Sequence, residues 1–284
     1  MTKIGFNVLA WSANVSEDLY PIIERLKKTG YDGVEYFVGS EDIKNYKLVG
    51  DRSRELGLEV TCVTVVSPDA NPVSDDSKIR EKGLDRVKWA IDRTHEIGGS
   101  ILCGPFHSAH AHFYGRPATA DELKWSAENM HSAGQHAQQA GVTLALEALN
   151  RFECYLVNTM ADLAKLVKEV NHPHVRAMFD THHSNIEEKK YAAAVNDIAP
   201  YLEHVHISEN DRGTPGSGHI PFDDAFAALK SINYDGWLTI EAFSRSDPDF
   251  ANAINVWREY DDAWDIAEKG LKFIQEMSAK HGLK

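Results

Sequence analysis

Residues Val142-Thr-Leu-Ala-Leu-Glu147 form a short apolar run that ends in a carboxylate. A predominantly apolar run of this length is typical of a strand buried on both faces, as in a parallel sheet covered by helices. Similar runs alternate with helix-like stretches along the whole chain. Eight such pairs predict an α/β fold, a (β/α)8 TIM barrel. The predicted strands are Ile4–Leu9, Gly33–Phe37, Glu59–Val65, Ser100–Gly104, Val142–Glu147, Val175–Asp180, Glu203–Ile207 and Trp237–Ala242.

Helix signals fill the segments between these strands. Thr119-Ala-Asp-Glu122 has the pattern of a capping box, which predicts that a helix begins there. Apolar residues recur at helical spacing from Leu163 to Val170, after a capping residue at Thr159. Gly98 and Gly141 each precede a predicted strand, where a left-handed residue is expected to end the preceding helix.

Length and composition fit one barrel rather than two small domains. The 284 residues are 43% hydrophobic, so we expect a single domain over residues 1–284. A formal net charge of −13, with scattered basic residues, argues against nucleic acid as a partner. The chain has no long apolar run and no apparent leader, so we expect a cytoplasmic protein with no membrane partner. Cys62, Cys103 and Cys154 lie far apart and predict neither disulfides nor a thiolate metal site.

Four consecutive predicted strands close on an ionisable residue. These residues are Glu147, Asp180, His206 and Glu241, spaced by about one strand–helix unit of roughly 35 residues. In a TIM barrel the carboxyl ends of the strands build the active site, so we expect the four side chains around one mouth. Three carboxylates brought together repel one another unless a cation lies between them. The sequence therefore predicts a divalent metal, most simply Mn²⁺, with Mg²⁺ or Co²⁺ as alternatives.

The other histidines are predicted to lie outside the metal's ligand set. His107, His110 and His112 follow the fourth predicted strand and could line the mouth; they are left out of the metal ligands, and the sequence leaves their role open. His172, His174 and His204 are interpreted as structural or solvated residues.

Four segments of the second half carry a family resemblance. The chain resembles the ketose 3-epimerases, the D-tagatose and D-psicose (D-allulose) 3-epimerase group of the sugar isomerase and epimerase TIM barrels. None of the segments alone would be specific, but together they are. They are Glu147-Ala-Leu-Asn-Arg-Phe-Glu153, Asp180-Thr-His-His183-Ser-Asn-Ile-Glu-Glu188, His206-Ile-Ser-Glu-Asn-Asp-Arg212 with Pro215-Gly216, and Ile240-Glu241-Ala-Phe243.

The resemblance implies roles for particular residues. It implies that Glu147, Asp180, His206 and Glu241 bind the metal, and that the chain acts on a sugar and associates as a dimer or tetramer. It also implies that Glu153, His183 and Arg212 hold the hydroxyl and carbonyl oxygens of the substrate.

The sequence departs from the family pattern at positions that shape the substrate pocket. His110 stands where family members carry a tryptophan, and the segment Asn7-Val-Leu-Ala-Trp11 is less aromatic than the family's first strand end. These departures leave the identity of the sugar open.

Inverting a carbon beside a ketone requires removal of its proton, stabilisation of an enediolate and return of a proton to the opposite face. Two bases on opposite sides of the substrate are therefore needed. We expect Glu147 and Glu241 to serve as this pair, with the metal acting as a Lewis acid on the sugar oxygens.

Other reactions fit the same residues. Aldose–ketose isomerisation, hydroxypyruvate isomerisation, and epimerisation or β-elimination of a 3-keto-glycoside all proceed by enolisation and remain open. A barrel endonuclease is disfavoured by the acidic charge and by Gly216-Ser-Gly-His-Ile220, which stands where an Asp-Arg-His segment is expected. A catalytically silent sugar-binding barrel is disfavoured because all four strand-end residues are present.

Overall fold

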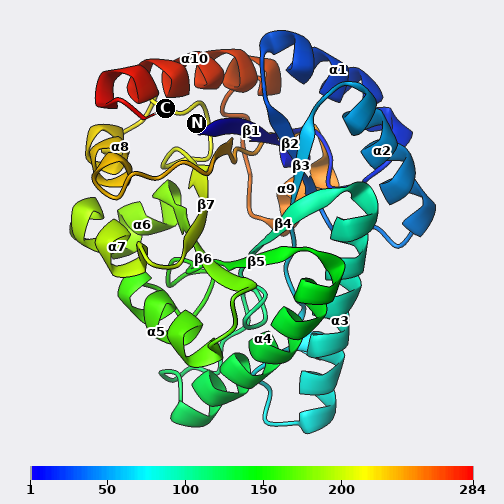
Figure 1. Ribbon diagram of the computed structural model, residues 1–284, viewed down its shortest axis with the longest axis vertical. Helices are drawn as coiled ribbons and strands as arrows, with labels where there is room; N and C mark the ends of the chain where they lie inside the picture. The colour runs from blue at the N-terminus through cyan, green and yellow to red at the C-terminus, as the bar shows by residue number, and fades with distance from the viewer. Residues whose placement is uncertain (1, 284) are drawn as a thin grey trace.

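The computed structural model describes residues 2–283, in which eight parallel strands close into a barrel surrounded by helices (Figure 1). Each strand pairs with the next in sequence order, and β8 pairs back onto β1 through Ile4 and Leu238. The predicted (β/α)8 TIM barrel is thus confirmed. The strands are β1 (Lys3–Asn7), β2 (Gly33–Phe37), β3 (Glu59–Val63), β4 (Gly99–Gly104), β5 (Thr143–Leu146), β6 (Val175–Asp180), β7 (Leu202–Ile207) and β8 (Trp237–Ile240).

Helices follow the strands and form the outer layer of the barrel (Figure 1). Three short 3-10 helices lie in loops, at η1 (Val8–Ala10), η2 (Glu17–Leu19) and η3 (Pro68–Ala70). The α-helices are α1 (Tyr20–Thr29), α2 (Ile43–Glu55), α3 (Ser77–Ile97), α4 (Ala120–Ala140), α5 (Met160–Val170), α6 (Thr181–Glu187), α7 (Tyr191–Ile198), α8 (Phe222–Ser231), α9 (Pro248–Ala253) and α10 (Ala263–His281). Within residues 2–283, no helix combines the length and the apolar character needed to cross a membrane.

The helix boundaries follow the predicted caps. Thr119 and Glu122 form a reciprocal capping box at the start of α4, and the side chain of Thr159 accepts a hydrogen bond from the backbone of Asp162 in α5. Gly98 and Gly141 end α3 and α4 with φ angles of 85° and 69°, a conformation that glycine adopts without steric cost.

The first strand is shorter than predicted. The range Ile4–Leu9 was expected to be extended, but β1 ends at Asn7 and the chain turns into η1. The cause is the side chain of Asn7, whose Oδ1 accepts a hydrogen bond from the backbone N–H of Leu9 at 2.9 Å. An asparagine side chain that accepts a hydrogen bond from the backbone two residues later competes with strand pairing. Here this local hydrogen bond ends the strand.

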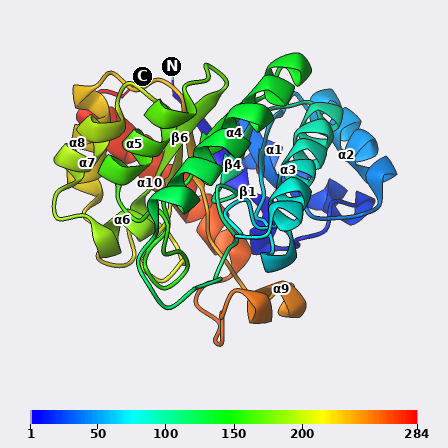
Figure 2. The same cartoon turned by 90° about the horizontal axis from the view of Figure 1, so that it is seen from below.

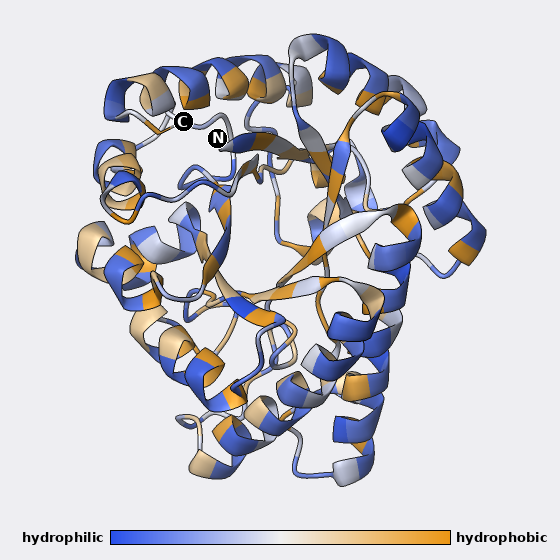
Figure 3. Ribbon diagram, viewed as in Figure 1, coloured by the Kyte–Doolittle hydropathy of each residue, from blue (hydrophilic) through white to orange (hydrophobic). Residues whose placement is uncertain are grey.

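Buried apolar side chains form one large core cluster. The helices are coloured mostly as hydrophilic on the side that faces away from the barrel (Figure 3). A smaller apolar cluster includes Val63, Ile101, Met178 and Trp237. Trp237 begins β8 and packs closely on Gly33 of β2, where an added Cβ would lie 2.5 Å from the indole ring. The amino-terminal end of the barrel is therefore tightly packed at this point. Helix α9 follows β8 and projects from the opposite end of the barrel (Figure 2).

Glu122→Gln is expected to destabilise the protein without touching the barrel mouth. Glu122 is 2% exposed and accepts hydrogen bonds from Arg116, the backbone of Thr119 and the hydroxyl of Tyr155. Burial alone would raise the pKa of Glu122, but these donors outweigh it and lower the pKa to about 2. We expect a loss of about 2 kcal/mol in the free energy of unfolding at neutral pH.

The pH dependence of this loss follows from the lowered pKa. A carboxylate with a lowered pKa stabilises the fold above its unfolded-state pKa, and loses that contribution as the pH falls toward its folded-state value. The stability difference between wild type and Glu122→Gln should therefore shrink between pH 4.5 and pH 2. Urea denaturation at several pH values measures it, and a difference that stays constant down to the lowest pH at which both fold would contradict the expectation.

Candidate active site

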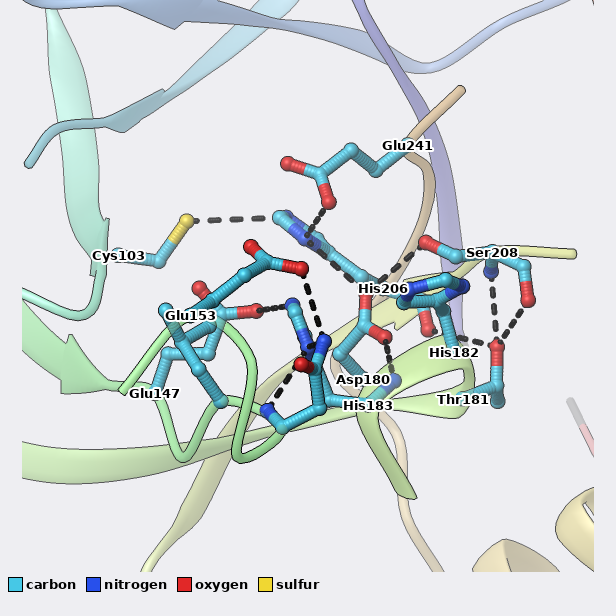
Figure 4. A network of polar contacts seen from close by, with 12 residues as sticks. Cys103, Glu147, Glu153, Asp180, Thr181, His182, His183, His206, Ser208 and Glu241 are labelled. Atoms are coloured by element: carbon cyan, nitrogen blue, oxygen red, sulfur yellow. Dashed lines mark hydrogen bonds and ion pairs between the residues drawn. The ribbon is translucent and has the colours of Figure 1, made fainter. Parts of the chain in front are cut away.

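The four strand-end residues meet at the carboxyl end of the barrel (Figure 4). Glu147 and Glu241 lie one residue beyond β5 and β8, Asp180 is the last residue of β6, and His206 is next to last in β7. Each of the four offers a ligand atom, and these atoms all lie within 4.8 Å of one another. The structure therefore brings together all four residues that the sequence singled out, and all four come from the second half of the chain.

Two buried polar atoms of this cluster lack a hydrogen-bond partner among residues 2–283. They are Nδ1 of His206 and Oε1 of Glu147. Nδ1 of His206 lies 3.4 Å from Oε2 of Glu241 and 3.8 Å from Oδ2 of Asp180. A buried polar atom without a partner is costly, and a cation bound by all four side chains would satisfy both atoms at once. The donor set, three carboxylates and one imidazole, fits a hard divalent cation.

The charge of Arg212 partly balances the carboxylates. Nη1 of Arg212 donates to Oε2 of Glu241 at 2.7 Å and lies 3.2 Å from Oδ2 of Asp180. Burial alone would raise the pKa of Asp180, but the charge of Arg212 and the nearby imidazoles lower it. Burial alone would also raise the pKa of Glu241, but the charges of His206 and Arg212 outweigh burial and lower this pKa. Three carboxylates and one guanidinium leave a formal charge of −2, which matches a divalent ion.

Glu147 and His206 have raised pKa values in the protein without a metal. Burial raises the pKa of Glu147 well above its usual range, and the charge of Glu241 adds to the shift. Burial would lower the pKa of His206, but the charges of Glu35 and Glu241 raise it well above its usual value. In the metal-free protein these raised pKa values favour the protonated forms of Glu147 and His206, and the protons offset part of the negative charge of the cluster.

The residues implied as substrate ligands lie beside this cluster and are joined by Asn150. The backbone N–H of Asn150 donates to Nδ1 of His183 at 3.1 Å, and its side-chain amide donates to Oε1 of Glu153 at 2.8 Å. On the other edge of its ring, Nε2 of His183 lies 2.9 Å from Nη2 of Arg212. The structure therefore places Glu153, His183 and Arg212 in one connected polar wall next to the four strand-end residues. The sequence did not single out Asn150, which lies in the turn between Glu147 and Glu153 and has no periodic signal.

Arg212 has an uncommon backbone conformation. Its φ angle is 64°, in the left-handed region that side chains other than glycine rarely adopt. Its backbone N–H donates to the carbonyl oxygen of Glu209 at 3.1 Å. Backbone strain of this kind clusters at functional sites, where surrounding contacts hold it.

The three histidines after β4 have different surroundings. His107 is fully buried, and its Nε2 donates to the backbone carbonyl of Glu147 at 2.8 Å. Burial lowers the pKa of His107 to about 4, so it is neutral at physiological pH and supports the backbone that carries Glu147. His110 lies 3.3 Å from Glu153 at the polar wall, and the ring of His112 packs edge-on against Tyr114. None of the three belongs to the four-residue cluster.

A second polar cluster lies beside the first and was not predicted. Glu35 in β2 lies 2.8 Å from His206 and 2.9 Å from His204, and Cys103 also contacts it. All four residues are buried. His204 is fully buried in this second cluster. Its partner Glu35 gave only one signal in the sequence, a carboxylate in the middle of a strand.

Comparison with known proteins identifies the family to which the chain belongs. The family model described as xylose isomerase-like TIM barrel matches residues 23–283. L-ribulose 3-epimerase of Methylomonas sp. (strain DH-1) is 33% identical over 96% of this chain and 97% of its own length. A crystal structure of D-allulose 3-epimerase from Methylomonas sp. in complex with D-allulose superposes with a TM-score of 0.91 at 32% identity, covering 97% of both chains.

A relative with another reaction is also similar. The 3-dehydro-D-guloside 4-epimerase of Escherichia coli (strain K12) is 30% identical over 81% of this chain and 89% of its own length. The chain is therefore a member of the xylose isomerase-like TIM barrel family, and within it belongs to the ketose 3-epimerases.

Proposed function

We propose that this chain is a metal-dependent epimerase that inverts C3 of a free ketose through a cis-enediolate. The observation that carries the proposal is the pair Glu147 and Glu241, which come from β5 and β8 and share one buried cluster of ligand atoms. In the metal-free protein the pKa of Glu147 is raised and that of Glu241 is lowered, so the two carboxyl groups differ in proton affinity. Such a pair is what an acid and a base need at the start of a proton transfer.

Glu147, Asp180, His206 and Glu241 would hold the metal, for which Mn²⁺ is the first candidate and Mg²⁺ and Co²⁺ are alternatives. A divalent ion in this position supplies Lewis acidity toward the oxygens of the substrate. The cluster has the required ligand types, a formal charge that a divalent ion neutralises and two buried atoms without a hydrogen-bond partner among residues 2–283.

In the proposed reaction, the ionised glutamate removes the proton from C3 of the ketose. The electron pair of the broken C–H bond forms the double bond of the enediolate, and the negative charge moves to the former carbonyl oxygen. The protonated glutamate then delivers its proton to C3 from the other face and becomes the new base. Because one glutamate gains a proton and the other loses one, the net proton balance of the enzyme is unchanged.

The polar wall orients the sugar between the two glutamates. Arg212 is 9% exposed and His183 only 2%, so their hydrogen bonds to substrate oxygens would form away from bulk water. Preorganised donors in such a place stabilise the negative charge that develops in the transition state. Glu153 would accept a hydrogen bond from a sugar hydroxyl, and its ionised state is secured because His110, His183 and Arg212 outweigh burial and lower its pKa.

A second candidate is epimerisation of a 3-keto-glycoside at the carbon beside its ketone. It is favoured by the similarity to the 4-epimerase of Escherichia coli. The same two glutamates would exchange the proton, and only the contacts between the substrate and the walls of the pocket would differ.

The test is turnover of a panel of free ketoses and 3-keto-glycosides in deuterated water with added Mn²⁺. Epimerisation of a free ketose with deuterium at C3 is the expected result. Deuterium at C4 of a keto-glycoside, with no ketose converted, would establish the second candidate instead. Interconversion of aldose and ketose, with deuterium at C1 or C2, would point to another enolising isomerase and overturn the proposal.

A further inference from the structure

Glu35 is a buried carboxylate next to the proposed metal site but is not one of its four ligands. It projects from β2, is 0% exposed, and its Oε1 lies 2.8 Å from Nε2 of His206. Because an ionised carboxylate only accepts hydrogen bonds, His206 must donate this one from Nε2. When the ring is neutral, the lone pair of the imidazole is then on Nδ1, the atom that faces Asp180 and Glu241.

Neighbouring strands hold this carboxylate in place. Oε1 accepts a second hydrogen bond from the side-chain amide of Asn7 in β1 at 3.0 Å, and Oε2 accepts one from the hydroxyl of Thr61 in β3 at 2.9 Å. Nε2 of His204 and Sγ of Cys103 lie 2.9 Å and 3.4 Å from Oε2. Both oxygens of Glu35 are therefore engaged as acceptors, and the group cannot rotate away without leaving buried donors unpaired.

No stability argument explains a carboxylate here. An isolated buried charge is costly, and an apolar side chain in a barrel interior is the less costly choice. Within residues 2–283, no lysine or arginine pairs with Glu35, whose polar neighbours are imidazoles, a thiol, an amide and a hydroxyl. The one neighbour with a chemical role is His206.

We infer that Glu35 is a positioning residue for the metal: it fixes the Nε2–H tautomer of His206 and so presents the Nδ1 lone pair to the ion. Thr61 and Asn7 act through it by orienting its two oxygens. This inference rests on the metal binding stated under the proposed function, but it concerns the metal site alone and is independent of which substrate is turned over. Carboxylate–histidine–metal arrangements of this kind orient the ligand ring and raise its basicity.

Glu35→Gln is the direct test, because an amide keeps the shape and has only one acceptor oxygen. Either His206 or the donors at Oε2 then lose their acceptor. We expect Mn²⁺ affinity, measured by isothermal titration calorimetry, to fall about 10- to 100-fold with the overall fold retained. Glu122→Gln is the matched control: it also neutralises a buried carboxylate with several donors, but lies outside both clusters, and its Mn²⁺ affinity should equal that of wild type.

A second measurement reads the tautomer directly. Long-range ¹⁵N–¹H correlation spectra of the Mg²⁺-loaded protein should show His206 protonated at Nε2 with Nδ1 unprotonated. The same spectrum of Glu35→Gln should show a changed or mixed pattern for this ring. If Glu35→Gln does not fold, Thr61→Val replaces it, since this nearly isosteric change removes one hydrogen bond to Oε2; a several-fold loss of Mn²⁺ affinity is then expected.

The outcomes are distinct. Wild-type Mn²⁺ affinity in Glu35→Gln, or in Thr61→Val if that is the variant that folds, would overturn the inference, as would an Nδ1–H tautomer in the loaded wild type. Two ions bound per chain would overturn it as well, because Glu35, Cys103, His204 and His206 would then be a metal site of their own. A wild type that binds one Mn²⁺ but converts no sugar would refute the proposed function and leave the role of Glu35 intact.

Discussion

Glu147→Gln and Glu241→Gln should each reduce epimerisation at least about 10³-fold, since each removes one of the two groups that exchange a proton with C3. An amide occupies the same volume as the carboxyl group but has no proton affinity in the useful range. Both residues lie at strand ends and are nearly fully buried, so the barrel should still form. Steady-state rates at saturating Mn²⁺ and sugar measure the effect.

Deuterium exchange separates a proton-transfer role from loss of the metal. With one glutamate intact, the enzyme can still remove and return a proton on one face of the enediolate. Each variant should therefore incorporate solvent deuterium at C3 of only one epimer, and the two variants should choose opposite epimers. Wild-type epimerisation rates in either variant would refute the assignment of that residue.

Removal of the metal is expected to have the second large effect. Protein dialysed against a chelator should lose at least about 10²-fold in turnover, because the Lewis acid that lowers the barrier to enolisation is gone. Readdition of Mn²⁺ should restore the rate. The melting temperature should also fall, since an ion present at about 100 times its Kd contributes about 2.7 kcal/mol to the folded state. Full activity in chelated protein, with metal content checked by elemental analysis, would contradict the expectation.

Metal affinity should also rise with pH. The raised pKa of His206 means that its imidazole holds a second proton in the metal-free protein, and this proton must leave before the ring can bind the ion. Binding therefore releases protons and is favoured as the pH increases. Calorimetry in two buffers of different ionisation enthalpy counts the protons released.

The strand-end residues were predictable from sequence because their geometry depends on two simple facts. A buried parallel strand is an apolar run, and its carboxyl end lies at the active-site face of the barrel. Once the runs around Leu144 and Ala177 were identified as strands, Glu147 and Asp180 had to lie at the same mouth. The capping pattern at Thr119 was predictable for a similar reason, because its hydrogen bonds are made within one turn of the chain.

The contacts behind the site were not predictable in this way. Glu35 lies within β2, and its partners come from β1, β3, β4 and β7, so the sequence separations range from 26 residues for Thr61 to 171 for His206. Which face of the strand it occupies depends on the register of the whole barrel. The early end of β1 was missed for the opposite reason, because a single local hydrogen bond of Asn7 outweighed an apolar pattern that suits a strand.

The four proposed ligands all come from β5 to β8, whereas the segments that depart from the family pattern follow β1 and β4. The proposed metal ligands and the segments that depart from the family pattern are thus encoded by different stretches of the gene. Mutational libraries restricted to the loops after β1 and β4 can search for new sugars while leaving the proposed ligand set untouched. A duplicated copy of this gene could diverge in substrate range by the same route, through changes in its first half alone.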